Sequence, residues 1–200
     1  MAHHEVTFPI TDPAEIMKLR AGDEVTVQGH IIGIRDRTQI RIFDQGVEPP
    51  MDLSGAFLLH TAPNVRKVSE DAEGRGTYEK ICIGTTTSAR MVRFTEPLGE
   101  QYGVRAICGK GGFPDEAIEP MRRLGMVYFA IVGGAAALET TQIEEIEEVM
   151  WEELMPECLW KFRVKDFGPL TVGIDAHGNS LYHDVQTEAR KRLEGILARL

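Results

Sequence analysis

Apolar and polar residues alternate along this chain in blocks that predict short strands separated by helices. Residues 24–34 place apolar Val25 and Val27 between polar Thr26 and Gln28, the alternation of a half-buried strand. Short apolar runs predict further strands at residues 56–59, 106–108, 126–132, 159–164 and 170–174. Capping residues and helical spacing predict helices at residues 11–20, around Ile40 and Phe43, and at residues 114–124 and 185–200. Because strands and helices alternate, the predicted fold class is α/β.

Two segments have weaker patterns. Residues 63–76 are charged and contain glycine, which predicts a loop. In residues 143–149 an apolar residue recurs at every third position, with glutamates between. This segment could be helix or strand, and its charge run is typical of a solvated face.

The central stretch, residues 81–112, contains the most suggestive chemistry. Short apolar runs at 81–83 and 106–108 predict buried strands, and each ends at a glycine followed by polar residues. Three threonines after Gly84 predict the start of a helix, which would place Thr86 and Arg90 on one face. Lys110 follows the second run between two glycines. A hydroxyl, a guanidinium, an ammonium and free N–H groups suit a small polycarboxylate or a phosphate.

Two other interpretations of this stretch were weighed. Glycine and threonine at a strand-to-helix turn often serve only to cap the helix, and this alternative stays open. A phosphate-binding P-loop requires glycine, four residues, then Gly-Lys-Ser/Thr. Here Gly103 is one residue too far from Gly109, and Gly111 follows the lysine, so the motif is absent.

Composition and charge narrow the function classes. The 200 residues, 42% hydrophobic and 26% charged, are ordinary for a globular protein and are expected to form a single domain over residues 1–200. A net charge of −9 argues against nucleic acid as the main partner. No apolar run approaches the roughly 18 residues of a membrane helix, and the first residues do not resemble a signal peptide. We therefore expect a cytoplasmic protein without a membrane partner.

Three cysteines occur in the chain. Their odd number and the lack of a Cys-x-x-Cys pair argue against a disulfide framework and a zinc site. Cys82 and Cys108 lie in apolar runs, so we expect both to be small buried hydrophobes. No metal ligand is assigned to this chain.

Several motifs in order along residues 9–182 resemble one enzyme family. The chain resembles the family formed by the β subunit of L(+)-tartrate dehydratase and the C-terminal domain of class I iron–sulfur fumarases. The likeness rests on Leu19-Arg20-Ala21-Gly22-Asp23, on Gly29 through Arg35-Asp36, on His60 through Lys67, on Gly84 through Met91, on Gly109-Lys110-Gly111-Gly112 and on Gly133-Gly134-Ala135-Ala136. Segments 144–157 and 165–179 look closest to the tartrate enzyme.

The resemblance implies a fold, a partner and a reaction. The fold would be a swivelling β/β/α domain with a mixed sheet and flanking helices. The partner would be an α subunit, in a heterotetramer, that holds a [4Fe–4S] cluster on three cysteines, while this chain binds no cluster. The cluster would act as a Lewis acid in the loss of the substrate hydroxyl. The reaction would be dehydration of a hydroxylated C4-dicarboxylate, either tartrate to oxaloacetate or malate/fumarate interconversion.

The resemblance also assigns roles to individual residues. By position, the residues that would hold substrate, chiefly its carboxylates, are Arg35, Arg90 and Lys110, with Thr87 and Gly111 beside them. Thr86 matches the threonine that moves the α-proton. A threonine hydroxyl is a poor base unaided, and Asp36 is the nearest carboxylate in sequence.

The chain departs from the family pattern at one catalytic position. The family carries a histidine where this chain has Gln39, which can form hydrogen bonds but cannot titrate. Two further positions of the family's Gly-Pro motifs differ: Thr85 replaces a proline, and Ala62 replaces a glycine before Pro63. These changes leave an alternative, a non-catalytic dicarboxylate-binding or regulatory paralogue, whereas the intact Thr86, Arg90 and Lys110 favour an enzyme.

Overall fold

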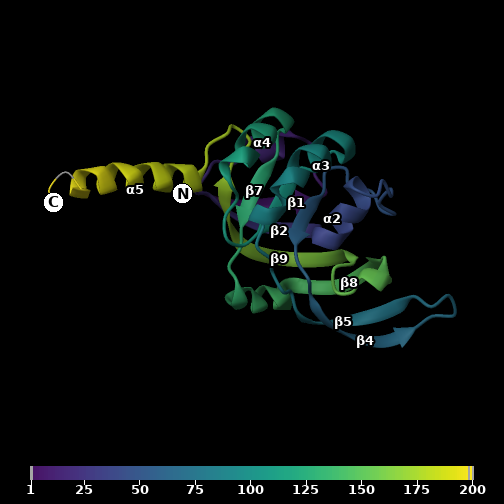
Figure 1. Cartoon of the computed structure of the whole chain (residues 1–200). Helices are drawn as coiled ribbons and strands as arrows, with labels where there is room; N and C mark the ends of the chain where they lie inside the picture. Colours follow the sequence, from purple (N-terminus) through teal and green to yellow (C-terminus); the bar gives the residue numbers. More distant parts are fainter. Residues whose placement is uncertain (1, 198, 200) are drawn as a thin grey trace.

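A seven-stranded mixed sheet forms the centre of the computed structural model, which describes residues 2–197 and 199 (Figure 1). Its strand order is β1-β2-β3-β6-β7-β9-β8. The first five in that order run parallel to one another: β1 (His3–Phe8), β2 (Glu24–Ile34), β3 (Phe57–His60), β6 (Ala106–Gly109) and β7 (Val127–Ala130). The antiparallel pair at the other end is β9 (Leu159–Ile174) and β8 (Ile143–Met150).

The sheet closes on itself as a small barrel. β2 pairs with β3 on one side and with β9 on the other, so strands β2, β3, β6, β7 and β9 form a continuous ring. Gly33 makes this closure possible, because a Cβ there would lie 2.7 Å from the ring of Phe162 and 3.1 Å from Cβ of Trp160. A larger residue would collide with the aromatic side chains that β9 contributes to the interior.

Two hydrophobic cores lie on the two faces of the sheet. Val27 and Ile31 of β2 point into the barrel, with aromatic side chains from β3, β7 and β9. Ile32 and Ile34 alternate with them and point outward, toward the helices. The period of two that predicted the strand therefore also divides its side chains between the two cores. Each fully buried aliphatic or aromatic side chain contributes about 1.5–3 kcal/mol.

Helices cover the outer core. These are α2 (Asp36–Phe43), η1 (Ala89–Phe94), α3 (Thr95–Tyr102), η2 (Asp115–Ala117) and α4 (Ile118–Leu124). α3 and α4 each end at a glycine in the left-handed conformation, Gly103 and Gly125, which satisfies the last carbonyls of the helix. The shorter helical segments are α1 (Ala14–Met17), η3 (Gly134–Ala137), η4 (Glu139–Gln142) and η5 (Glu152–Leu154).

The predicted loop at residues 63–76 is wrong. The chain forms a hairpin there, β4 (Asn64–Glu70) paired with β5 (Gly76–Cys82), which extends from the body of the protein (Figure 1). Most of its side chains are solvent-exposed, so the sequence carries loop-like charges instead of an apolar face. The strand predicted at 81–83 exists for residues 81–82, the end of β5, but its expected burial is wrong: Ile81 is 60% exposed, Cys82 is half-buried, and only Ile83 is buried.

Other predicted boundaries of strands and helices differ from those in the structure. β1 was not predicted, because it is a short edge strand with mainly polar residues. Residues 143–150 form a strand, and the two strands predicted within 159–174 are one strand. The last helix, α5 (Leu181–Leu197), begins four residues earlier than predicted, and residues 198 and 200 lie outside the described part. Within that part, no helix has the length and apolar character that a membrane crossing requires.

Candidate active site

A cleft of about 320 Å³ lies at the carboxyl ends of the parallel strands. Arg35 follows β2, Ala62 lies two residues beyond β3, and Lys110 follows β6. Parallel strands end at a common edge, where α/β folds usually place their ligands. The remaining lining residues are Gly84, Thr85, Thr86, Thr87 and Arg90. The structure thus brings together Arg35, Thr86, Thr87, Arg90 and Lys110 of the predicted site.

Residues 85–87 run between the ends of β3 and β6, with isolated bridges to Thr61 and Lys110. The N–H of Thr86 donates to the carbonyl of His60 at 2.8 Å, and the N–H of Lys110 donates to the carbonyl of Thr86 at 3.1 Å. The predicted helix start at Thr85 is therefore wrong, and helical structure begins only at Ala89. Hydrogen bonds to two strand ends replace those of a helix, so Thr86 and Arg90 meet in the cleft without sharing a helix face.

Gly84 is required where this segment enters the cleft. Its φ is +60°, in the left-handed region. A Cβ on residue 84 would lie 2.2 Å from the carbonyl oxygen of Ala62, closer than any two such atoms can approach. The glycine therefore lets residues 84–88 leave the hairpin and lie against β3.

Lys110 provides the least neutralised positive charge of the cleft. Its side chain is partly buried and lies near Gly133, where a Cβ would be 3.7 Å from Cδ of the lysine. No carboxylate in the described part of the chain pairs with its ammonium group, and no hydrogen bond from Nζ is formed there. An anion that entered the cleft would find this charge available.

The two arginines are used to different extents. Arg90 donates from Nε and Nη2 to the two carboxylate oxygens of Asp36, at 2.8 and 2.7 Å, a bidentate pair. Arg35 donates from Nε to Asp36 at 3.2 Å, and the same nitrogen lies 3.8 Å from Glu157. Among the described residues nothing accepts a hydrogen bond from the terminal nitrogens of Arg35, so that end of its guanidinium can bind a carboxylate.

Asp36 is a charge partner of the arginines. Burial raises the pKa of this carboxyl, but the hydrogen bonds and charge of Arg90, with a bond from Arg35, outweigh burial and lower the pKa below 3.8. Asp36 is therefore ionised at neutral pH, and both its oxygens accept hydrogen bonds from Arg90. It does not line the cleft, which gives it a positioning role toward Arg90 in this conformation.

Thr86 brings an uncharged hydroxyl to the cleft. The residue is only 6% exposed, and its hydroxyl has no hydrogen-bond partner within the described structure. Thr87, beside it, forms a bridge with Lys110 and packs its methyl group near Gly111. Gly111 is exposed and lies behind Thr87, outside the residues that line the cleft.

Gln39 lies beneath the cleft. The residue is fully buried on α2, and its Nε2 is 3.0 Å from the sulfur of Met91 and 3.4 Å from the carbonyl of Arg35. Its Oε1 is buried without a partner. The structure therefore places Gln39 behind Arg35, without direct access to a ligand in the cleft.

A buried polar cluster below the cleft was not assigned from the sequence. Nδ1 of His60 lies 2.9 Å from the hydroxyl of Ser88, and the Tyr128 hydroxyl donates to the Gly109 carbonyl at 2.7 Å. Burial lowers the pKa of His60 to about 3, the charge of Asp36 raises it slightly and that of Arg90 lowers it slightly, so the imidazole is neutral. A polar residue ending the all-apolar run of β3 was the available sequence signal. The cluster holds the backbone that presents Thr86 and Lys110.

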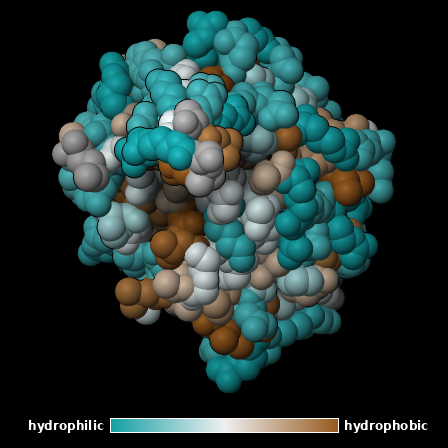
Figure 2. Space-filling view, turned by 60° about the vertical axis from the view of Figure 1, so that its left-hand side comes forward, coloured by the Kyte–Doolittle hydropathy of each residue, from teal (hydrophilic) through white to brown (hydrophobic). Residues whose placement is uncertain are grey.

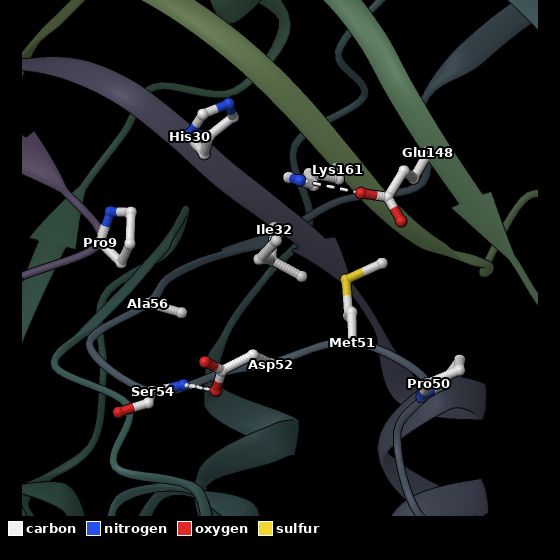
Figure 3. Close-up of a pocket in the computed structure, with 10 residues that line it drawn as sticks. All are labelled: Pro9, His30, Ile32, Pro50, Met51, Asp52, Ser54, Ala56, Glu148 and Lys161. Atoms are coloured by element: carbon white, nitrogen blue, oxygen red, sulfur yellow. Dashed lines mark hydrogen bonds and ion pairs between the residues drawn. The ribbon is translucent and has the colours of Figure 1, made fainter.

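A second hollow, of about 410 Å³, lies on β2 beside the loop that precedes β3 (Figure 3). Ile32 and Met51 provide an apolar wall, and Lys161 and Glu148 point toward each other across it, 2.8 Å apart. The histidine of this hollow, His30, pairs with a glutamate outside it, at 3.1 Å. The lysine of this hollow is thus already paired with a carboxylate of the fold.

The cysteines do not form a metal centre in the described part of the chain, where no three His, Cys, Asp or Glu residues are grouped to hold an ion. Cys108 and Cys158 are buried, and Cys82 is half-buried at the end of the hairpin, which corrects the expectation that it is fully buried. Burial raises the pKa of Cys158 to about 12, which disfavours a thiolate ligand. The three cysteines are therefore not arranged as a set of cluster ligands in this structure.

Comparison with known proteins gives consistent relatives. The family model described as fumarase C-terminus matches residues 3–185. The chain is 39% identical over 177 residues to the L(+)-tartrate dehydratase subunit beta of Escherichia coli strain K12, covering 88% of this chain and 85% of that protein. It is 33% identical over 198 residues to a putative L(+)-tartrate dehydratase subunit beta of Methanocaldococcus jannaschii, covering 96% and 98%. A putative class I fumarate hydratase of Geobacillus stearothermophilus is 34% identical over 186 residues, covering 92% of this chain but 34% of that protein.

Proposed function

The chain belongs to the fumarase C-terminus family, and on that premise we propose that it is the β subunit of a hydro-lyase. Its substrate would be a hydroxylated C4-dicarboxylate, with L-tartrate the first candidate and malate or fumarate the second. The names of its relatives, a tartrate dehydratase β subunit and a class I fumarate hydratase, support this substrate class.

The observation that carries the proposal is that the cleft contains positively charged nitrogens without a carboxylate partner among the described residues. The ammonium of Lys110 and the terminal nitrogens of Arg35 have no partner in the described structure, and both residues line the same cleft as Thr86. A C4-dicarboxylate has a carboxylate at each end, so each cationic group can hold one. Two such contacts would fix the carbon between them beside Thr86, which is the positioning that a stereospecific elimination requires.

Dehydration removes a proton from one carbon and hydroxide from the next. In this chain Thr86 is the group we propose to move the proton, as a relay, because Arg90 already occupies the carboxylate of Asp36. Departure of hydroxide from an unactivated carbon requires a Lewis acid or a strong general acid. We propose that an α subunit bearing a [4Fe–4S] cluster supplies that Lewis acid where it meets the cleft.

The decisive experiment is an anaerobic assay of the purified chain alone and of the chain co-expressed with a candidate α subunit encoded by the neighbouring open reading frame. Tartrate, malate and fumarate would be offered separately, with product followed by absorbance. We expect activity from the pair and none from the single chain. Turnover by the single chain in metal-free buffer would refute the two-subunit proposal.

Gln39 favours a second candidate, a dicarboxylate-binding paralogue without catalysis. It replaces a histidine of the family pattern with a group that cannot titrate. Calorimetry on the assembled pair separates the two: binding of a dicarboxylate without turnover on any of the three acids would favour the paralogue.

A further inference from the structure

The last helix, α5, contacts the rest of the protein only through its first turn. Tyr182 packs near Gly112 and Gly173, where added Cβ atoms would lie 3.1 and 2.9 Å from its ring, and His183 lies 2.9 Å from Asp115. None of the helix's 17 residues is buried. The whole helix is about 25 Å long at about 1.5 Å per residue. Beyond its first turn it projects from the body (Figure 1).

An apolar stripe runs along this projecting helix. Val185, Leu193 and Ile196 are 69%, 53% and 55% exposed, and Ala189 lies between them at spacings of four and three residues. Such spacing places the four side chains on one face. In Figure 2, where the side carrying α5 comes forward, brown apolar atoms are visible among the teal polar ones on that side.

The part of α5 beyond its first turn, residues 185–197, is only marginally stable by itself in water. Isolated helices up to about 12–15 residues long are marginal, and an interior glycine such as Gly195 costs a further ~1 kcal/mol. The stripe is the obvious means of stabilising it, because burying it against a partner would remove apolar surface from water.

The charges of α5 identify a partner that fits. Glu188 and Arg192 lie on one flank of the stripe, where they form an ion pair with each other at 2.9 Å along the helix. Two copies lying antiparallel would place Glu188 of each near Arg192 of the other, so the same two charges would also pair between the copies. A parallel arrangement would place like charges together, which is unfavourable.

The surface shape of α5 agrees with such pairing. A hollow on the helix is lined by Val185, Glu188, Ala189 and Arg192, together with Asp184. Residues i, i+3, i+4 and i+7 are the four that form the hole in knobs-into-holes packing, and the small Ala189 keeps it open. An apolar side chain of a facing helix, such as Leu193 of a second copy, suits this hole.

We propose that α5 is a self-association element that pairs antiparallel with α5 of a second copy about a two-fold axis. Such an interface is isologous, because each copy contributes the same surface. The family match ends at residue 185, so nearly all of the stripe lies beyond the region that this chain shares with the family model. The pairing does not depend on the proposed reaction. A single helix pair is smaller than the usual interface of about 1,600 Å², so we expect a weak, concentration-dependent dimer.

Sedimentation velocity of the full chain over a hundredfold range of concentration tests this proposal. We expect the wild type to shift from monomer to dimer, and the double variant Val185→Glu with Leu193→Glu to remain monomeric throughout. Thr187→Glu adds a charge on the opposite face and is the matched control, expected to dimerise like the wild type. Far-ultraviolet circular dichroism verifies that each variant is folded. A wild type that stays monomeric, or a double variant that still dimerises, would overturn the proposal.

Variants of α5 with reversed charges identify the molecule that binds the apolar stripe. One variant carries Glu188→Lys, and the other carries Arg192→Glu. Each alone is expected to dimerise at least tenfold more weakly than the wild type, and an equimolar mixture is expected to regain a one-to-one dimer. Failure of the mixture to associate would overturn antiparallel pairing. Loss of co-purification with an α subunit, with no change in self-association, would assign the stripe to that subunit instead.

Discussion

Two hollows of this protein contain a lysine, yet only one lysine is available to a ligand. In the hollow of Figure 3, Nζ of Lys161 lies 2.8 Å from Glu148 and 3.6 Å from Glu147. In the cleft at the strand ends, Lys110 has no such partner among the described residues. The hollow is the larger of the two, about 410 against 320 Å³. Unmatched charge is therefore a better guide to the candidate site than volume.

The difference follows from where each lysine lies in the sheet. Lys161 is in the interior of β9, and its cross-strand neighbour on β8 is Glu148, so the ladder itself supplies a counter-ion. Lys110 follows the last residue of β6, and the segment beside it is not a strand but residues 85–87, through the bridge between Thr87 and Lys110. Strand interiors match charges in pairs, whereas strand ends leave them for a ligand.

Removal of the two lysines provides the largest expected contrast. In the assembled enzyme, Lys110→Ala is expected to reduce kcat/KM about 10- to 150-fold, because a charge-assisted hydrogen bond contributes about 1.5–3 kcal/mol. The control, Lys161→Ala, is expected to leave kcat/KM within about twofold. Steady-state kinetics with melting curves distinguish binding from folding. A large fall in Tm with unchanged kinetics for Lys110→Ala would show that the lysine serves the fold.

A smaller effect is expected from Arg90→Lys. The planar fork of Arg90 holds both oxygens of Asp36, and a lysine cannot keep that geometry while also facing the cleft. We expect kcat/KM to fall about tenfold, the equivalent of about 1.4 kcal/mol. Arg93→Lys is the matched control, because Arg93 forms a similar bidentate pair with Asp44 away from the cleft. Equal kinetics in the two variants would remove Arg90 from the site.

The ion pair of Asp36 should have a modest effect on stability, and one that depends on pH. Its pKa is lowered in the folded protein, so the stabilisation is present above the ordinary value of 3.8 and is lost as pH falls through the lowered pKa. Since the pair is partly exposed, Asp36→Asn is expected to cost less than about 1 kcal/mol at pH 7. Urea unfolding from pH 7 down to pH 2.5 measures this. A difference between variant and wild type that persists at the lowest pH would contradict the assignment.

The smallest effect is expected at position 39. A histidine with its ordinary pKa would titrate near neutrality, but residue 39 is fully buried like His60, whose pKa burial lowers to about 3. We therefore expect Gln39→His to leave the pH–rate profile of the assembled enzyme unchanged between pH 6 and 8. A new inflection in that range would show that burial does not lower the pKa of a histidine at position 39 and that this residue is coupled to the chemistry.

Sequence patterns predicted the fold class and most of the parallel strands. β2 was predicted with its observed bounds, because alternation of side chains is a local property of a strand that lies between two cores. The residues Arg35, Thr86, Arg90 and Lys110 were also identified, through family motifs at matching positions, and the structure brings them to one cleft. The hairpin escaped prediction because its exposed strands have no apolar periodicity.

What the sequence determined by itself is thus the set of elements with a buried face and the residues available for chemistry. The tertiary structure decided which of those residues stay free. Thr86 is not helical because its backbone bonds to strand ends 26 and 24 residues away, at His60 and Lys110. Arg90 is paired because Asp36, 54 residues earlier, lies opposite it. Such contacts join distant segments, and a local pattern cannot contain them.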